Sequence, residues 1–200
     1  NTIGADNAWR EGKFFNGLLL DGVDGRVDFG PLQLDKNFSF SFWVYPEANA
    51  TIDGEMTLLS KTGITSMNHF RLFKMDGNGS IGLDFFADGN ETPQRLISNS
   101  SILTDRTWNN FVLTFNASTG SLNLLANGEP VISASSLLAT SGSIPYGFRF
   151  CNLVAGAQSS SFHGIIDDLR LYEVELDINE VRSIYNSGGG DFHTIKINGF

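Results

Sequence analysis

Cysteine is almost absent from this sequence. The 200 residues include one cysteine, Cys151, so an intrachain disulfide is excluded and the fold must be stabilised by its core or by a metal ion. Neither a second cysteine nor a nearby histidine accompanies Cys151, which therefore lacks the partner that a nucleophilic thiol requires. We expect Cys151 to be a small buried residue.

Basic residues and long apolar runs are also scarce. Lysine and arginine total 13 against 22 acidic residues, which gives a formal net charge of −9. Proteins that bind nucleic acid need clustered basic side chains to release counterions from phosphates, so the charge argues against a nucleic-acid partner and suits neutral ligands or cations. No apolar run approaches the roughly 18 residues of a membrane span, so membrane insertion is not expected.

Phenylalanine and glycine are abundant, at 17 and 22 residues. Residues 38–45 alternate cleanly, with Phe38, Phe40, Phe42 and Val44 on the face that we assign to the core. Turn signals such as Asn127-Gly128 recur about every eight to twelve residues, and only one helical pattern occurs. The pattern predicts an all-β protein built as an antiparallel β-sandwich.

The one helical pattern follows a strand near the C-terminal end. Residues 162–173 read as a strand, and the period becomes helical from Asp177, a candidate N-cap with Glu180 three residues later. Val181, Ile184 and Tyr185 then share one helical face. We expect a short C-terminal helix that packs against the sandwich.

An acidic pair, Asp167-Asp168, lies inside that hydrophobic strand. Burying ionised carboxylates costs several kcal/mol each unless a cation or hydrogen-bond donors compensate them. Residues 21–25 form a second acidic segment, a tight loop with Asp21, Asp24 and several carbonyl groups. Such oxygen-rich loops suit Ca²⁺, although this loop alone is better explained as a solvated hairpin turn.

Two predicted strands, 69–75 and 80–86, carry unusual outward-facing side chains. If alternate residues face the core, His69, Arg71 and Phe73 share the outer face with Asp84 and Phe86. Aromatic rings beside charged groups can bind a sugar by stacking and hydrogen bonding. In the structural alternative, Phe73 and Phe86 pack beneath a loop and Arg71 pairs with Asp84.

Four stretches of the sequence together resemble a known superfamily. They are GLLLDGVDGRVDFG at 17–30, FSFSFWVYPEAN at 38–49 with LLSKTG at 58–63, TWNNFVLTFNASTGSLNLLANGEPV at 107–131, and FHGIIDDLRLYEVELDINEVRSIYN at 162–186. In order and spacing they resemble laminin-G-like domains of the concanavalin A-like lectin and glucanase superfamily, with Asn110 as a departure where relatives often carry His.

The resemblance implies an antiparallel jelly-roll sandwich of two sheets with six or seven strands, one sheet concave, and adjacent first and last strands. It also implies that Asp21 and Asp167 lie close together and, with Asp24, hold a structural calcium ion. In the alternative, Asp167 merely accepts backbone N–H bonds. We expect the domain to span residues 1–187, with residues 188–200 as a linker and an edge strand or the start of another domain.

A lectin-like, non-catalytic carbohydrate-binding module of a larger secreted or surface protein is the function we expect. Six Asn-x-Ser/Thr sequons weakly favour the same extracellular setting. A protein-binding adhesion domain that uses loops such as 135–146 is the alternative. The candidate ligand-binding residues come from the presumed concave face and nearby loops: His69, Arg71, Phe73, Asp84, Phe86, Tyr146 and Arg149.

Catalysis is the least favoured interpretation. Related jelly-roll glucanases use closely spaced carboxylates on one strand face. Here the densest acidic run, Glu173, Glu175 and Asp177, lies where a strand passes into a helix and lacks the ExDxxE arrangement. The three histidines are scattered, without metal-binding spacing or a nucleophile beside them. We therefore predict no catalytic residues.

Overall fold

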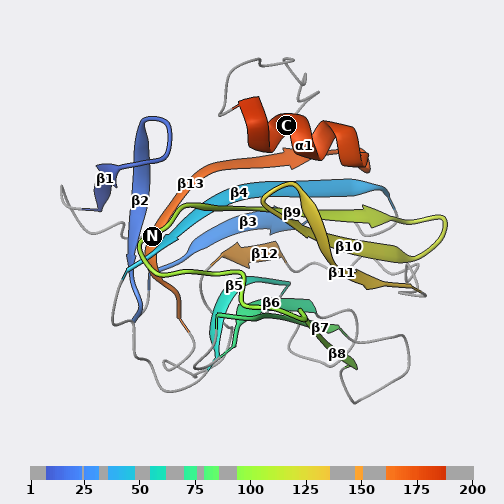
Figure 1. Ribbon diagram of the computed structural model, residues 1–200, viewed down its shortest axis with the longest axis horizontal. Coiled ribbons are helices and arrows are strands. Elements are labelled where there is room, and N and C mark those ends of the chain that lie inside the picture. Colours follow the sequence, from blue (N-terminus) through green and yellow to red (C-terminus); the bar gives the residue numbers. More distant parts are fainter. Residues whose placement is uncertain are drawn as a thin grey trace.

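Two antiparallel sheets and one helix make up the part of the chain that the structure describes (Figure 1). The structure is a computed structural model, and it describes residues 8–23, 25–31, 36–47, 55–61, 70–75, 79–85, 94–135, 147–150 and 161–187. Within these ranges the predicted all-β sandwich with a single C-terminal helix is confirmed. Cys151 and the segment 188–200 lie outside them.

The larger sheet has seven strands. Their spatial order is β1 (Trp9–Glu11), β2 (Asn16–Asp21), β13 (His163–Tyr172), β4 (Phe38–Pro46), β9 (Asn109–Asn116), β10 (Ser121–Ala126) and β11 (Glu129–Ala134). Strand β13 pairs with β2 on one side and β4 on the other, which confirms that the N-terminal and C-terminal strands are adjacent. Strand β2 starts at Asn16, directly after a turn in which Gly12 N–H donates to the Phe15 carbonyl.

The smaller sheet has six strands. Their order is β3 (Val27–Pro31), β12 (Gly147–Phe150), β5 (Met56–Lys61), β6 (Phe70–Lys74), β7 (Ile81–Phe85) and β8 (Gln94–Ile97). Strand β12 thus enters between β3 and β5, although it comes about ninety residues later in the chain than β5. All pairs in both sheets are antiparallel.

Phenylalanine fills the space between the sheets. The side chains of Phe38, Phe40, Phe42 and Val44 are buried, as the alternation predicted. Phe42 on β4 meets Phe150 on β12 edge to face at 4.9 Å between ring centroids, so this contact joins the two sheets. Burying each such ring contributes about 1.5–3 kcal/mol, so the core can stabilise the sandwich without a disulfide.

Helix α1 (Ile178–Ser187) covers the outer face of the seven-stranded sheet (Figure 1). Val181 is fully buried against Val112, Leu125 and Tyr172, and Ile184 packs beside them. Tyr185 stacks on Trp43 of β4 with centroids 5.8 Å apart. The predicted helical face is therefore confirmed. No helix in the described ranges is long and apolar enough to cross a membrane.

Candidate functional site

A row of polar residues crosses the six-stranded sheet on its face away from the core. Cross-strand partners point to the same side of a sheet, and the neighbouring row of Leu59, Leu72 and Leu83 points into the core. We call the opposite-facing set the polar row. It runs through one residue on each strand, in the order Asp28, Arg149, Ser60, Arg71, Asp84 and Arg95.

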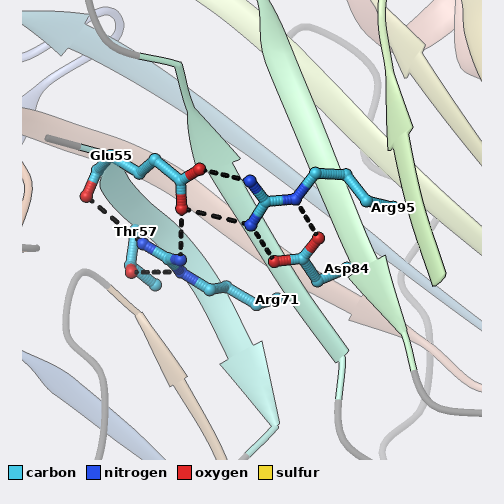
Figure 2. A network of polar contacts seen from close by, with 5 residues as sticks. All are labelled: Glu55, Thr57, Arg71, Asp84 and Arg95. Atoms are coloured by element: carbon cyan, nitrogen blue, oxygen red, sulfur yellow. Dashed lines mark hydrogen bonds and ion pairs between the residues drawn. The ribbon is translucent and has the colours of Figure 1, made fainter. Parts of the chain in front are cut away.

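Ion pairs fix one end of the polar row (Figure 2). Arg95 holds Asp84 in a bidentate pair, with Nε–Oδ1 and Nη2–Oδ2 distances of 2.7 Å. Glu55, which precedes β5, accepts from Arg95 Nη1 at 2.6 Å and from Arg71 Nη1 at 2.7 Å. Arg71 Nε also donates to the Thr57 hydroxyl at 2.9 Å. The carboxylate of Glu55 therefore bridges two guanidinium groups and holds both in fixed positions.

Phe73 lies beneath these guanidinium groups. The Arg71 and Arg95 Cζ atoms lie 4.6 and 4.7 Å from its ring centroid, within the range of cation–π attraction. On its cross-strand neighbour Gly82, any Cβ would collide with the Phe73 ring, so glycine is required there. The Phe73 side chain is 0% exposed. In this arrangement the ring supports the arginines, in line with the alternative in which Phe73 packs away from solvent, and stacking of Phe73 on a sugar stays a prediction.

The other end of the polar row is built around Asp28. Arg149 Nε donates to Asp28 Oδ1, and Arg26 Nε donates to Oδ2 at 3.1 Å. Burial opposes ionisation of Asp28, but the hydrogen bonds from Arg149 and Arg26 bring its pKa below the ordinary value. Asp28 thus stays a carboxylate between two cations.

Accessibility differs along the polar row. The Arg95 side chain is 43% exposed and Glu55 is 25% exposed, whereas Asp84 is 9% exposed. Burial lowers the pKa of the Arg71 guanidinium, while hydrogen bonds to Asp84 raise that of Arg95. Arginine nevertheless remains protonated in proteins. In the ion-pair network of Figure 2, Arg95 and Glu55 are consequently the residues best placed to meet a ligand.

Three of the predicted ligand-binding residues lie together in the polar row: Arg71, Asp84 and Arg149. Arg71 pairs with Glu55 rather than with Asp84, whose partner is Arg95. Phe73 lies beneath the guanidinium groups, and the remaining three predicted residues, His69, Phe86 and Tyr146, lie outside the described ranges.

Sequence reasoning missed Arg95, Glu55 and Thr57. Arg95 could have been found, because Leu96 beside it faces the core and alternation then turns Arg95 outward. Glu55 gave no such signal, since it precedes its strand in a stretch that reads as a polar loop.

The structure does not bring the predicted metal ligands Asp21 and Asp167 together. Asp21 lies opposite His163, four residues before Asp167, which corresponds to about 13 Å along a strand. Asp167 Oδ2 accepts from Phe14 N–H and Oδ1 from Asp168 N–H, and Asp21 Oδ1 accepts from Val23 and Gly25 N–H groups. No group of three His, Cys, Asp or Glu in the described ranges could hold a metal ion. Asp24 lies outside those ranges, and calcium binding stays a prediction.

Comparison with known families decides the affiliation. Residues 20–182 match the family model of the concanavalin A-like lectin/glucanases superfamily. The chain belongs to this superfamily. No curated protein sequence matches the chain significantly.

Solved structures share the superfamily fold at low sequence identity. The CBM40 domain of a Ruminococcus gnavus IT-sialidase, bound to α2,3-sialyllactose, superposes with a TM-score of 0.63 at 16% identity over 84% of this chain and 95% of that one. Domain 4 of the Geobacillus stearothermophilus extracellular arabinanase AbnA, in complex with arabinotriose, gives 0.66 at 18% over 91% and 82%. The binding domain of Paraclostridial Mosquitocidal Protein 1 gives 0.68 at 18%, over 92% of this chain and 47% of that one.

Proposed function

We propose that this superfamily member is a non-catalytic carbohydrate-binding module whose ligand lies on the polar row. The observation that carries the proposal is a set of charged side chains, held by ion pairs, on five of the six strands of one sheet, with the polar Ser60 on the remaining strand β5. Fixed donors and acceptors orient sugar hydroxyl groups at little entropic cost. The sialyllactose and arabinotriose complexes of domains with the same fold support this ligand class.

The acidic residues near the polar row support binding rather than hydrolysis. Both Glu55 and Asp84 are held by guanidinium groups, whereas a glycosidase needs one carboxyl group that can deliver a proton. In the acidic run 173–177, Asp177 caps helix α1 and Glu175 accepts from the Asn116 side chain. These contacts give the carboxylates structural roles.

Arg95→Ala tests the proposed surface. The substitution removes the exposed guanidinium that links Glu55 and Asp84, so we expect glycan binding to fall at least tenfold, about 1.4 kcal/mol. Binding to a glycan array, followed by calorimetric titration of the hits, measures the change. Arg95 is preferable to Arg71 for this test. Arg71 is buried, so its removal would also disturb the packing around it and take a hydrogen bond away from Glu55.

Arg182→Ala is the matched control. The Arg182 side chain is 47% exposed, similar to that of Arg95. It lies in helix α1 and pairs with Glu129 of β11, at the other sheet. The Arg182→Ala variant should bind glycans as the unmodified chain does. Equal binding by the Arg95 and Arg182 variants would remove the polar row as the site.

The cellular setting belongs to the same proposal. We expect the module to act outside the cell as part of a larger protein, as domain 4 does in the extracellular arabinanase. The alternative of a protein-binding adhesion domain depends on loop 135–146, of which only residue 135 is described, and it stays a prediction.

A further inference from the structure

The polar row differs from a simple basic patch in that each of its cations is already paired. Arg71 and Arg95 contact Glu55, Arg95 also contacts Asp84, and Arg149 shares Asp28 with Arg26. We propose that this face binds neutral sugar units through their hydroxyl groups and discriminates against carboxylated sugars. The inference rests on the proposed carbohydrate-binding function and names the ligand class of that site.

A carboxylated ligand would have to compete with the protein's own carboxylates. The bidentate Arg95–Asp84 pair already occupies the fork of the guanidinium group that a ligand carboxylate would use. Displacing Asp84 would leave a nearly buried anion without its partner, which is a costly state. Glu55 occupies Nη1 of both Arg71 and Arg95 in the same way.

A hydroxyl group can bind without breaking these pairs. A guanidinium group has five N–H donors, and the exposed Arg95 uses four of them in its contacts with Asp84 and Glu55 within the described ranges, which leaves one N–H on Nη1. A carboxylate offers about four lone-pair positions, so paired carboxylates such as Glu55 keep acceptor capacity. A sugar hydroxyl both donates and accepts, and can therefore bridge a guanidinium and a carboxylate that stay in place.

The overall charge favours the same ligand class. Among the described residues, the ion pairs of this face join four arginines, Arg26, Arg71, Arg95 and Arg149, to three carboxylates, Asp28, Glu55 and Asp84, so 4 − 3 leaves an excess of one positive charge. The whole chain carries −9. At long range the negative charge of the whole chain outweighs the single positive excess of this face and repels anionic ligands, whereas a neutral glycan is unaffected by it.

Matched glycan pairs test the inference. The full chain is titrated with lactose and α2,3-sialyllactose, and with neutral array hits, arabinotriose included, beside their carboxylated counterparts, at about 0.05 and 0.5 M NaCl. We expect the neutral member of each pair to bind at least tenfold more tightly, with affinity that changes less than twofold with salt. Tighter, salt-sensitive binding of the acidic members would overturn the inference and leave the carbohydrate-binding function standing. An absence of binding to every glycan would overturn both.

Two variants give a second readout. Arg95→Lys keeps the charge but lacks the planar fork, so we expect it to lose neutral-glycan binding as fully as Arg95→Ala. Retained binding by Arg95→Lys alone would show that charge, not geometry, is recognised, and would overturn the inference. Glu55→Gln removes one competing carboxylate, and we expect it to narrow the preference for neutral glycans by several-fold. An unchanged preference would also count against the proposed competition.

Discussion

Asp168 has a conformation that few residues in a β-strand adopt. Its φ angle is 49°, in the left-handed region that Asp and Asn tolerate better than most side chains. It lies in a bulge, since the register of β13 with β4 shifts between Asp167 and Arg170. Asp168 Oδ1 accepts from Arg170 Nε, but Oδ2 is buried without a hydrogen-bond partner in the described ranges. Burial accordingly raises the pKa of the Asp168 carboxyl group.

Asp168→Asn should change how stability depends on pH. The folded pKa of Asp168 lies above the unfolded value of 3.8, so the folded state binds more protons between the two values. The resulting stabilisation is complete below 3.8 and is lost as the pH rises through the folded pKa. The original chain should therefore lose stability relative to the Asn variant over this window. Urea unfolding between about pH 3 and pH 7 measures it, and a difference independent of pH would contradict the assignment.

Single residues were predictable where alternation fixed their face. Arg71 and Asp84 follow from the core-facing Leu72 and Leu83 beside them, and the structure places both on the outer face. The sequence offered burial of Phe73 only as packing beneath a loop, and its cover by two arginines from different strands could not be foreseen. Alternation gives the side of a sheet, whereas coverage depends on tertiary contacts.

At the scale of elements, helix α1 begins with a reciprocal cap. Asp177 Oδ1 accepts from the backbone N–H groups of Asn179 and Glu180, and the Glu180 side chain accepts from the Asp177 N–H group. These are the contacts of a capping box, in which each side chain satisfies a backbone donor at the helix start. The sequence spacing predicted them because capping depends on local residues alone.

Asp177→Ala should destabilise the chain by about 1 kcal/mol, because two backbone N–H groups lose their acceptor. Denaturant unfolding measures the change. Asp177→Ser retains a capping oxygen and should cost markedly less. A loss of the same size in both variants would show that the cap is not the cause.

Strand neighbours were predictable from the family resemblance, but their register was not. The adjacency of β2 and β13 is confirmed, while Asp21 pairs with His163 instead of approaching Asp167. A shift by two residues keeps the same side chains on the core face, so a hydrophobic pattern alone cannot distinguish such registers. The bulge in β13 changes the offset further along the strand.

For the whole molecule, calcium binding can be tested separately from the prediction that Asp21 and Asp167 are its ligands. A structural ion stabilises the folded state that binds it, so chelation of a calcium-bound domain lowers the melting temperature. We expect EDTA to lower it if residues outside the described ranges, such as Asp24, hold calcium. Because Asp167 accepts two backbone N–H groups, Asp167→Asn should not change the response to EDTA.

Thermal melts with calcium and with EDTA, on protein freed of tightly held ions, provide the measurement. A melting temperature unaffected by EDTA would contradict calcium binding. A chelator effect that disappears in Asp167→Asn would instead restore Asp167 as a ligand.

The position of β12 between β3 and β5 also has a consequence for how the domain is made. Strands β3 and β5 are synthesised early, but they become neighbours only through β12, whose Arg149 follows Asp28 by 121 residues. Contacts between such distant segments form slowly during folding. Until residue 150 has left the ribosome, Asp28 and Ser60 have no strand to join them, so the polar row is completed late in the synthesis of the chain.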